Sequence, residues 1–116
     1  MLVVVDPGAR TPVFAQIAAQ IAAQVAAGSL ATGTRLPAAR ELAGSLGANV
    51  HTVLHAYQQL RDEGVVELRR GRGAVIIGAP ADEDVHEAVR RAVAAARDSG
   101  LSLPTLLSLI RKEFGE

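Results

Sequence analysis

Apolar residues near the start of the chain repeat with the spacing of a single helix face. From Phe14 onward they stand at i, i+3, i+4, i+7 and i+11, which predicts one buried stripe on an amphipathic helix. The stripe consists of Phe14, Ile17, Ala18, Ile21 and Val25. Thr11 and Pro12 suit the N-cap and the first helical position, and Gly28 ends the pattern. We therefore expect a first helix from Pro12 to just before Gly28.

Two further features of this region are a polar stripe and an apolar run ahead of the helix. Gln16, Gln20 and Gln24 line a second face of the same helix, and a solvated surface is the simplest interpretation of that stripe. Ahead of the helix, the apolar run of residues 2–5 is closed by Asp-Pro-Gly at 6–8. This pattern predicts a short strand followed by a turn.

The middle of the chain carries two shorter helical patterns separated by a tight turn. Pro37 precedes a predicted helix over 38–46, and Gly47 is typical of the left-handed residue that ends helices. Asn49 can cap a third helix over 50–63. The buried face of that third helix is Val53, Ala56, Tyr57 and Leu60. The sequence therefore predicts a helix-turn-helix.

A basic hairpin follows the third helix. Residues 65–68 and 74–77 read as two strands, and the Arg-Arg-Gly-Arg-Gly sequence at 69–73 joins them. The order is helix, helix, tight turn, helix and hairpin. It predicts a winged helix-turn-helix domain over residues 1–78, in a chain that is mostly α with a small β-hairpin.

Two more amphipathic helices follow a short linker at 78–81. Asp82 can cap the fourth helix, and the fifth begins after Gly100. Two short helices cannot bury their apolar stripes alone, so they must pack on the winged domain, on a second copy, or on both. We expect a second copy, which makes residues 79–116 a two-helix dimerisation tail. The predicted dimer-interface residues are Val85, Val89, Val93, Leu103, Leu106, Leu107, Ile110 and Phe114.

Composition narrows the classes of function. The formal net charge is zero, yet seven arginines against five acidic residues give residues 1–78 a net charge of +2 and leave residues 79–116 at −2. The absence of cysteine excludes disulfides, thiolate metal ligands and cysteine nucleophiles. No apolar run approaches the ~20 residues of a membrane span or the core of a signal peptide. We therefore expect a soluble, cytoplasmic protein with no membrane partner.

The exposed face of the third helix carries the candidate chemistry. Opposite its buried face stand His51, Leu54, His55 and Gln58. In a helix-turn-helix the exposed face of the second helix enters the major groove of DNA with its N-terminal end first. Asn49, His51, Thr52 and His55 are therefore placed to meet phosphates and base edges.

The two histidines of this helix also allow a metal-binding interpretation. His51 and His55 stand at i, i+4, the separation at which two imidazoles can share a metal. No Glu follows His51, so the metalloprotease pattern is absent. Further ligands would have to come from elsewhere, for example His86, through folding or dimer contacts. We expect no metal, no cofactor and no enzymatic activity, because no nucleophile stands next to a base and no carboxylates are paired in a polar cleft.

Three motifs are similar to one family of regulators. They are LP-x-x-REL, LG-x-N-x-x-TV-x-x-AY-x-x-L-x-x-EG and RRGRG, all between Arg35 and Ile76. This segment resembles the DNA-binding domain of GntR-type bacterial transcription regulators, and residues 11–37 resemble their first helix and the loop after it. The short tail is similar to the YtrA-type subfamily, whose tails mainly make dimers and whose members often repress operons for ATP-driven transporters. Val50 and Leu54 depart from the pattern, since many members carry basic or polar contact residues there.

The resemblance and the predicted fold together imply a set of DNA contacts. The set is Arg35, Arg40, Asn49, His51, Thr52, His55, Arg70, Arg72 and Gly73. Arg35, Arg40 and Arg70 are expected to position the domain on phosphates, while the start of the third helix tests base edges. The wing tip, with Arg72, is expected to reach the adjacent minor groove.

The sequence thus predicts a homodimeric transcription repressor bound to double-stranded DNA. Two recognition helices about one helical turn apart require an inverted-repeat operator. The alternative is a winged-helix protein-interaction module whose hairpin is only a turn. A metal- or ligand-sensing regulator that uses His51 and His55 would add to the first interpretation, and any small-molecule effector is left unassigned.

Overall fold

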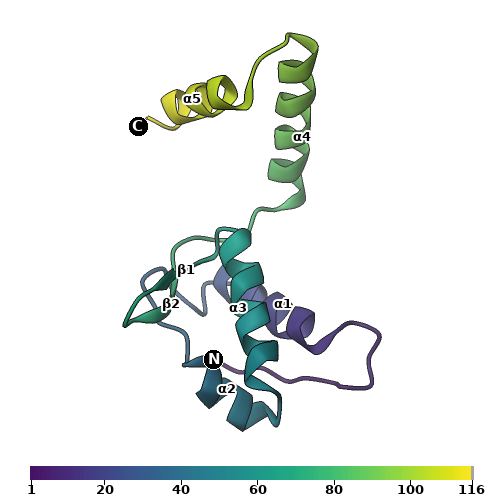
Figure 1. Ribbon diagram of the computed structural model, residues 1–116, viewed down its shortest axis with the longest axis vertical. Helices are drawn as coiled ribbons and strands as arrows, with labels where there is room; N and C mark the ends of the chain where they lie inside the picture. The colour runs from purple at the N-terminus through teal and green to yellow at the C-terminus, as the bar shows by residue number, and fades with distance from the viewer. Residues whose placement is uncertain (116) are drawn as a thin grey trace. The chain divides into compact units, whose positions relative to one another are not determined.

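The computed structural model describes residues 1–115 and divides them into two compact units (Figure 1). The first unit, Met1–Pro80, holds a three-helix cluster and a hairpin, and the second begins at Ala81. The elements in chain order are α1 Val13–Ala26, α2 Ala39–Leu46, α3 Val50–Asp62, β1 Val66–Arg69, β2 Gly73–Ile76, α4 Glu83–Asp98 and α5 Leu103–Phe114. The predicted winged helix-turn-helix followed by two C-terminal helices is therefore confirmed.

The core of the first unit lies where α3 packs against α1, α2 and β1. The predicted stripes supply it, since Ile17 and Ile21 of α1 and Val53 and Leu60 of α3 are completely buried. Burying a side chain of this size contributes about 1.5–3 kcal/mol to the free energy of unfolding. The apolar period of each helix thus fixes which face of α3 is left for a partner.

The turn between α2 and α3 has the geometry that its sequence predicts. Gly47 ends α2 in the left-handed region, at φ +65°, where a side chain would be strained. Two residues later the Asn49 Oδ1 accepts a hydrogen bond of 2.8 Å from the backbone N–H of His51. This cap satisfies one free donor at the helix start and fixes where α3 begins.

The hairpin pairs β1 with β2 in antiparallel register, with Val66 opposite Ile76 and Arg69 opposite Gly73. β1 starts one residue later than predicted, because the Val65 N–H still bonds the end of α3 through the Leu60 carbonyl at 2.9 Å. β2 starts one residue earlier than predicted, because Gly73 pairs opposite Arg69. The loop before α2 adds to the other edge of β2, where Arg35 forms a bridge with Val75. The wing is therefore tied to the helix-turn-helix.

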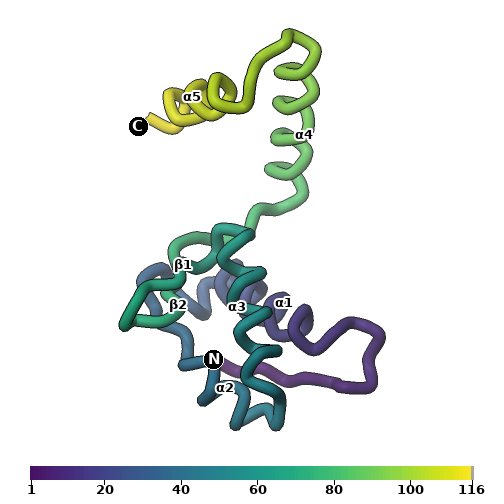
Figure 2. The backbone as a smooth tube through the Cα atoms, in the orientation of Figure 1, coloured from purple at the N-terminus to yellow at the C-terminus, as the bar shows by residue number. Residues whose placement is uncertain are grey.

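The N-terminal segment and the glutamine stripe both differ from the prediction. Residues 2–5 form no strand, and the three glutamines are not a solvated surface. Instead Gln20 accepts from the Val4 N–H at 2.9 Å and donates to the Val4 carbonyl at 2.5 Å. Gln16 makes the same pair of bonds with Asp6, and Gln24 donates to Leu2. The segment therefore runs antiparallel to α1 (Figure 2).

The spacing of the glutamines along α1 matches the spacing of residues 2–6 for a geometric reason. Four helical residues rise about 6.0 Å, and two extended residues rise about 6.6 Å. Glutamines at every fourth position of α1 can therefore reach every second residue of an extended chain, and their amides replace a partner strand. Val3, on the opposite side of the segment, is buried in the core.

The start of α1 also differs from the prediction. The helix begins at Val13, so Pro12 is the N-cap residue and Thr11 makes no side-chain cap. The Thr11 carbonyl instead accepts a 2.8 Å hydrogen bond from Gln16 Nε2. The same glutamine that holds the N-terminal segment thus also fixes the entry into α1.

Replacing Gln20 with alanine is expected to lower the free energy of unfolding of the chain by about 1–2 kcal/mol. The substitution removes both hydrogen bonds to Val4, each worth about 0.5–1.5 kcal/mol net, and loosens the cover over the core. Urea denaturation checks it. Gln58→Ala, at an exposed glutamine of α3, is the matched control, and equal stability of the two variants would contradict the role of Gln20.

The second unit consists of α4 and α5. Asp82 caps α4 by accepting from the Val85 N–H at 3.0 Å, as predicted, and Ser102 caps α5. Their apolar side chains are mostly exposed, with Ala96 as the one buried residue of these helices among the described residues. The exposed fraction is 50% for Val85, 52% for Val89 and 83% for Phe114. Val93 and Leu106 are half-buried.

None of the helices between residues 1 and 115 is both long enough and apolar enough to cross a membrane.

Candidate nucleic-acid interface

The N-terminal end of α3 presents three of the predicted contact residues together. Asn49 and His51 are exposed, and Thr52 is half-buried at the side of the helix. Because the cap uses the Asn49 Oδ1, the amide NH2 group of Asn49 is the part that can still donate to a ligand. The helix start therefore offers an amide donor, an imidazole and a hydroxyl.

His55 has a contact that the sequence did not predict. Its imidazole stacks on the ring of Phe14 from α1, with ring centroids 3.7 Å apart and planes inclined by 16°. Phe14 is correspondingly only half-buried, although the sequence places it on the core stripe. One face of the imidazole is thus covered by protein, so His55 can meet a ligand only through its other face or its edge.

Four exposed arginines provide positive charge around the helix-turn-helix. Arg35 precedes α2, Arg40 lies in its first turn, and Arg70 and Arg72 lie at the wing tip. Among the described residues none of these four forms a salt bridge, whereas Arg69 pairs with Glu67 at 3.0 Å. Their charges are therefore available to an anionic partner.

Arg35 lies beside the wing because the backbone of its loop pairs with β2. The loop carrying it bonds to β2, with the Leu36 N–H donating to the Ala74 carbonyl at 2.8 Å. The Arg35 Nε lies 4.0 Å from where a Cβ would stand on Gly73. That distance is an ordinary van der Waals contact, but a side chain at this position would be strained by its backbone, at φ +72°. Gly73 is thus needed for the backbone conformation that closes the wing beside Arg35.

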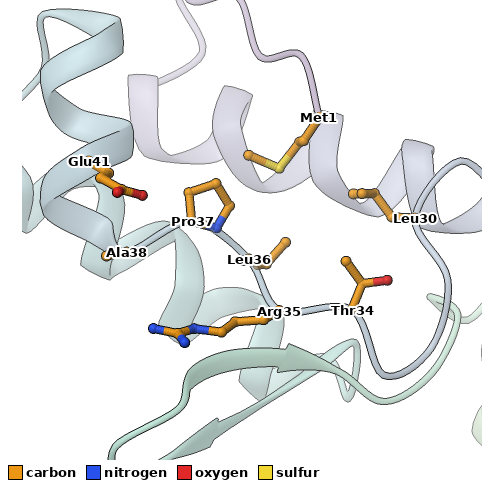
Figure 3. Close-up of a pocket in the computed structure, with 8 residues that line it drawn as sticks. All are labelled: Met1, Leu30, Thr34, Arg35, Leu36, Pro37, Ala38 and Glu41. Carbon is orange, nitrogen blue, oxygen red and sulfur yellow. The ribbon is translucent and has the colours of Figure 1, made fainter.

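A hollow of about 500 Å³ opens beside the same loop (Figure 3). It is lined by Met1, Leu30, Thr34, Arg35, Leu36, Pro37, Ala38 and Glu41. Figure 3 shows the Arg35 side chain pointing away from Met1.

A hydrogen bond from Tyr57 joins α3 to the segment that carries Arg35 and Arg40. The Tyr57 hydroxyl donates a 2.7 Å hydrogen bond to the Pro37 carbonyl, just before α2. Burial, reinforced by the negative charge of Glu41, raises the pKa of Tyr57 to about 12. The phenol therefore stays protonated near neutral pH and keeps its donor role.

A groove of about 420 Å³ runs between α3 and the wing. Its lining residues are Ala38, Ala39, Leu54, Tyr57, Gln58, Leu68, Arg69, Arg70, Gly73 and Ala74. Leu54 and Leu68 are apolar, yet 41% and 40% of their surface is exposed. The sequence places Leu54 on the exposed face of α3. That Leu68 lines the same groove depends on how the wing packs against α3, and no local sequence pattern indicates it.

The metal alternative finds no further ligands in the first 115 residues. No group of three or more His, Cys, Asp or Glu side chains there could hold a metal ion. The stack on Phe14 also occupies one face of His55. Within residues 1–115 of one chain, no third ligand of these types thus joins His51 and His55.

Three comparisons place this site among known proteins. The family model described as bacterial regulatory proteins, gntR family, matches residues 14–76, which contain every predicted DNA-contact residue. The HTH-type transcriptional regulator Rv1152 of Mycobacterium tuberculosis is 41% identical over 100 residues, 84% of this chain and 82% of that protein. The HTH-type transcriptional repressor YtrA of Bacillus subtilis is 40% identical over 75 residues, 65% of this chain and 58% of that protein.

Similarity in structure extends over both units. The structure described as YtrA from Sulfolobus acidocaldarius, a GntR-family transcription factor, is 34% identical in sequence and has a TM-score of 0.61. The match covers 95% of this chain and 94% of that one. A two-helix tail after a winged domain is therefore shared with a solved structure.

Proposed function

The chain belongs to the GntR family of bacterial DNA-binding transcriptional regulators, which are not enzymes, and we propose that it is a cytoplasmic, homodimeric repressor of an inverted-repeat operator. The observation that carries the proposal is the exposed start of α3 in the same unit as four exposed arginines, before α2, in α2 and at the wing tip, that have no acidic partner among residues 1–115. A named repressor among the relatives supports repression. In line with the YtrA-type resemblance, we assign it to a transporter operon.

Phosphate and base contacts divide between different parts of the first unit. Arg35, Arg40 and Arg70 hold phosphates, because they lie before α2, in its first turn and at the wing tip rather than on α3 itself. His51 reads a base edge, with the Asn49 amide and the Thr52 hydroxyl beside it. His55 adds an edge contact from its stack on Phe14. The phosphate contacts set the register, and the α3 contacts set the sequence.

The wing tip contacts the adjacent minor groove. Arg72 follows Gly71, and the turn ends at Gly73 with a left-handed backbone, so the tip is narrow and basic. A guanidinium is well suited to the negative potential of a narrow minor groove. Arg72 therefore adds affinity and a preference for groove shape.

The tail forms the dimer, which brings a second DNA-binding unit to the second half-site of the operator. In this proposal residues 1–78 bind DNA and residues 79–116 pair with the same residues of a second copy. The support is the apolar surface that α4 and α5 leave uncovered. It comprises Val85, Val89, Leu103, Leu107, Leu109, Ile110 and Phe114, with Val93 and Leu106 half-buried beside them. A two-fold contact between such faces also fixes the separation of the recognition helices.

Arg40→Ala is expected to weaken binding to operator and to random DNA by the same factor. A phosphate contact carries no sequence information, and its loss should reduce the slope of log affinity against log salt by about 1 for each protomer. Fluorescence anisotropy on both DNAs over a salt series measures this. Arg91→Ala, on α4, is the control. An Arg40 variant that binds as the parent does would remove Arg40 from the interface.

His51→Ala is expected to relax base preference at one position of each half-site. A good base-edge contact discriminates by about 1–3 kcal/mol, so the variant should lose that preference while its fold is unchanged. Competition binding with operators changed at single positions measures it, and His86→Ala is the histidine control. If zinc or nickel stabilises the parent but not the variant, and base preference is intact, His51 is a metal ligand instead.

A further inference from the structure

Leu54 is an apolar side chain on the recognition helix that the protein core does not use. It is 41% exposed and does not belong to the buried cluster. Val50, one turn earlier on the same side of α3, packs against that cluster. Leu54 lies one turn beyond His51 on the exposed side of the helix, so a nucleic acid that meets His51 meets Leu54 next.

The surroundings of Leu54 indicate what kind of partner covers it. It lines the groove between α3 and the wing, where Leu68 provides a second apolar side chain and Arg69 and Arg70 stand at the rim. Arg69 is partly neutralised by Glu67, and Arg70 forms no salt bridge among the described residues. An apolar floor beside an unpaired cation suits a partner that carries both a methyl or ring surface and an anionic backbone.

Duplex DNA presents one such apolar group in its major groove, the C5-methyl group of thymine. We propose that Leu54 is a specificity-determining residue that contacts the thymine methyl of one base pair in each half-site. The inference rests on the proposed operator binding and deepens it. By burying that methyl group, Leu54 selects thymine at one position of each half-site.

The test removes only the methyl group from the DNA. Operators obtained by selection with the full chain are synthesised with each thymine replaced in turn by deoxyuridine, which keeps the pairing and the O4 acceptor. Affinity is measured at fixed salt for the parent, for Leu54→Ala and for Ile77→Ala. Ile77 is the matched control, since it is 42% exposed and stands beyond the end of β2, outside the proposed interface.

The expected result is one sensitive thymine in each half-site. Burying a methyl is worth about 0.8 kcal/mol, so its removal should cost roughly fourfold in affinity at one half-site and roughly fifteenfold at both. Leu54→Ala should bind the thymine and uracil operators equally, and Ile77→Ala should keep the parent's sensitivity.

Two results would overturn the proposal. One is a selected half-site with no sensitive thymine. The other is a thymine-to-uracil affinity ratio in Leu54→Ala equal to that of the parent; if both operators are then bound more weakly by the same factor, Leu54 contacts deoxyribose instead. Enrichment of no sequence at all in the selection would instead contradict the proposed function itself.

Discussion

Removal of residues 81–116 is expected to lower affinity for a two-half-site operator on the order of a hundredfold or more. Without the tail, two winged units must bind as separate molecules. With it, the second unit is held near its half-site at a high effective concentration. Affinity for an isolated half-site should change little, because the DNA-contact residues all lie in the first unit. Sedimentation of both chains, with titrations at matched salt, measures both effects.

The truncated chain should still fold, since the hydrophobic cluster of the first unit is built from residues between Val3 and Ile76. A full-length variant tests whether the tail makes the dimer without removing any residue. Val89→Glu with Ile110→Glu places charges on side chains that are 52% and 44% exposed in the single chain, so the helices should persist while the dimer is lost. Arg91→Gln, on the opposite side of α4, is the control. A dimeric truncated chain would move the interface to the winged unit.

Raising the salt concentration from 50 to 200 mM is expected to reduce operator affinity on the order of a thousandfold. Three arginines of each protomer, Arg35, Arg40 and Arg70, are assigned to phosphates, and a dimer doubles them to about six contacts. Each contact releases condensed counterions from the duplex, so the slope of log affinity against log salt should be about −5. Titrations at four or more salt concentrations give the slope directly.

The same titration separates DNA binding from the protein-interaction alternative. A winged module whose basic hairpin is only a turn would show weak binding and a shallow slope on any duplex. Arg40→Ala should bring the slope closer to zero by about 2 in the dimer. A parent slope near zero would contradict the assignment of these arginines to phosphates.

The elements that sequence analysis located are those with strong local signals. The turn between α2 and α3 follows from Gly47 and Asn49, because a left-handed C-cap and a side-chain N-cap act within a few residues. The core face of α3 follows from the period of Val53 and Leu60. The fold class and the placement of the helix start could therefore be predicted.

Features that depend on contacts distant in sequence could not be predicted in this way. Gln20 binds Val4 across sixteen positions, and no helical period distinguishes a glutamine that holds a peptide from one that meets water. The stack of His55 on Phe14 requires knowing how α1 lies against α3. Each of these depends on tertiary packing, which local propensity does not encode.

Selection of bound sites from random duplex DNA, using the full-length chain, tests the central claim most directly. The account predicts enrichment of an inverted repeat whose half-site centres are about one helical turn apart, matching two recognition helices related by two-fold symmetry. The tail variant Val89→Glu with Ile110→Glu should enrich only single half-sites. Enrichment of single half-sites by the parent chain, or of no sequence at all, would contradict a dimeric operator-binding regulator.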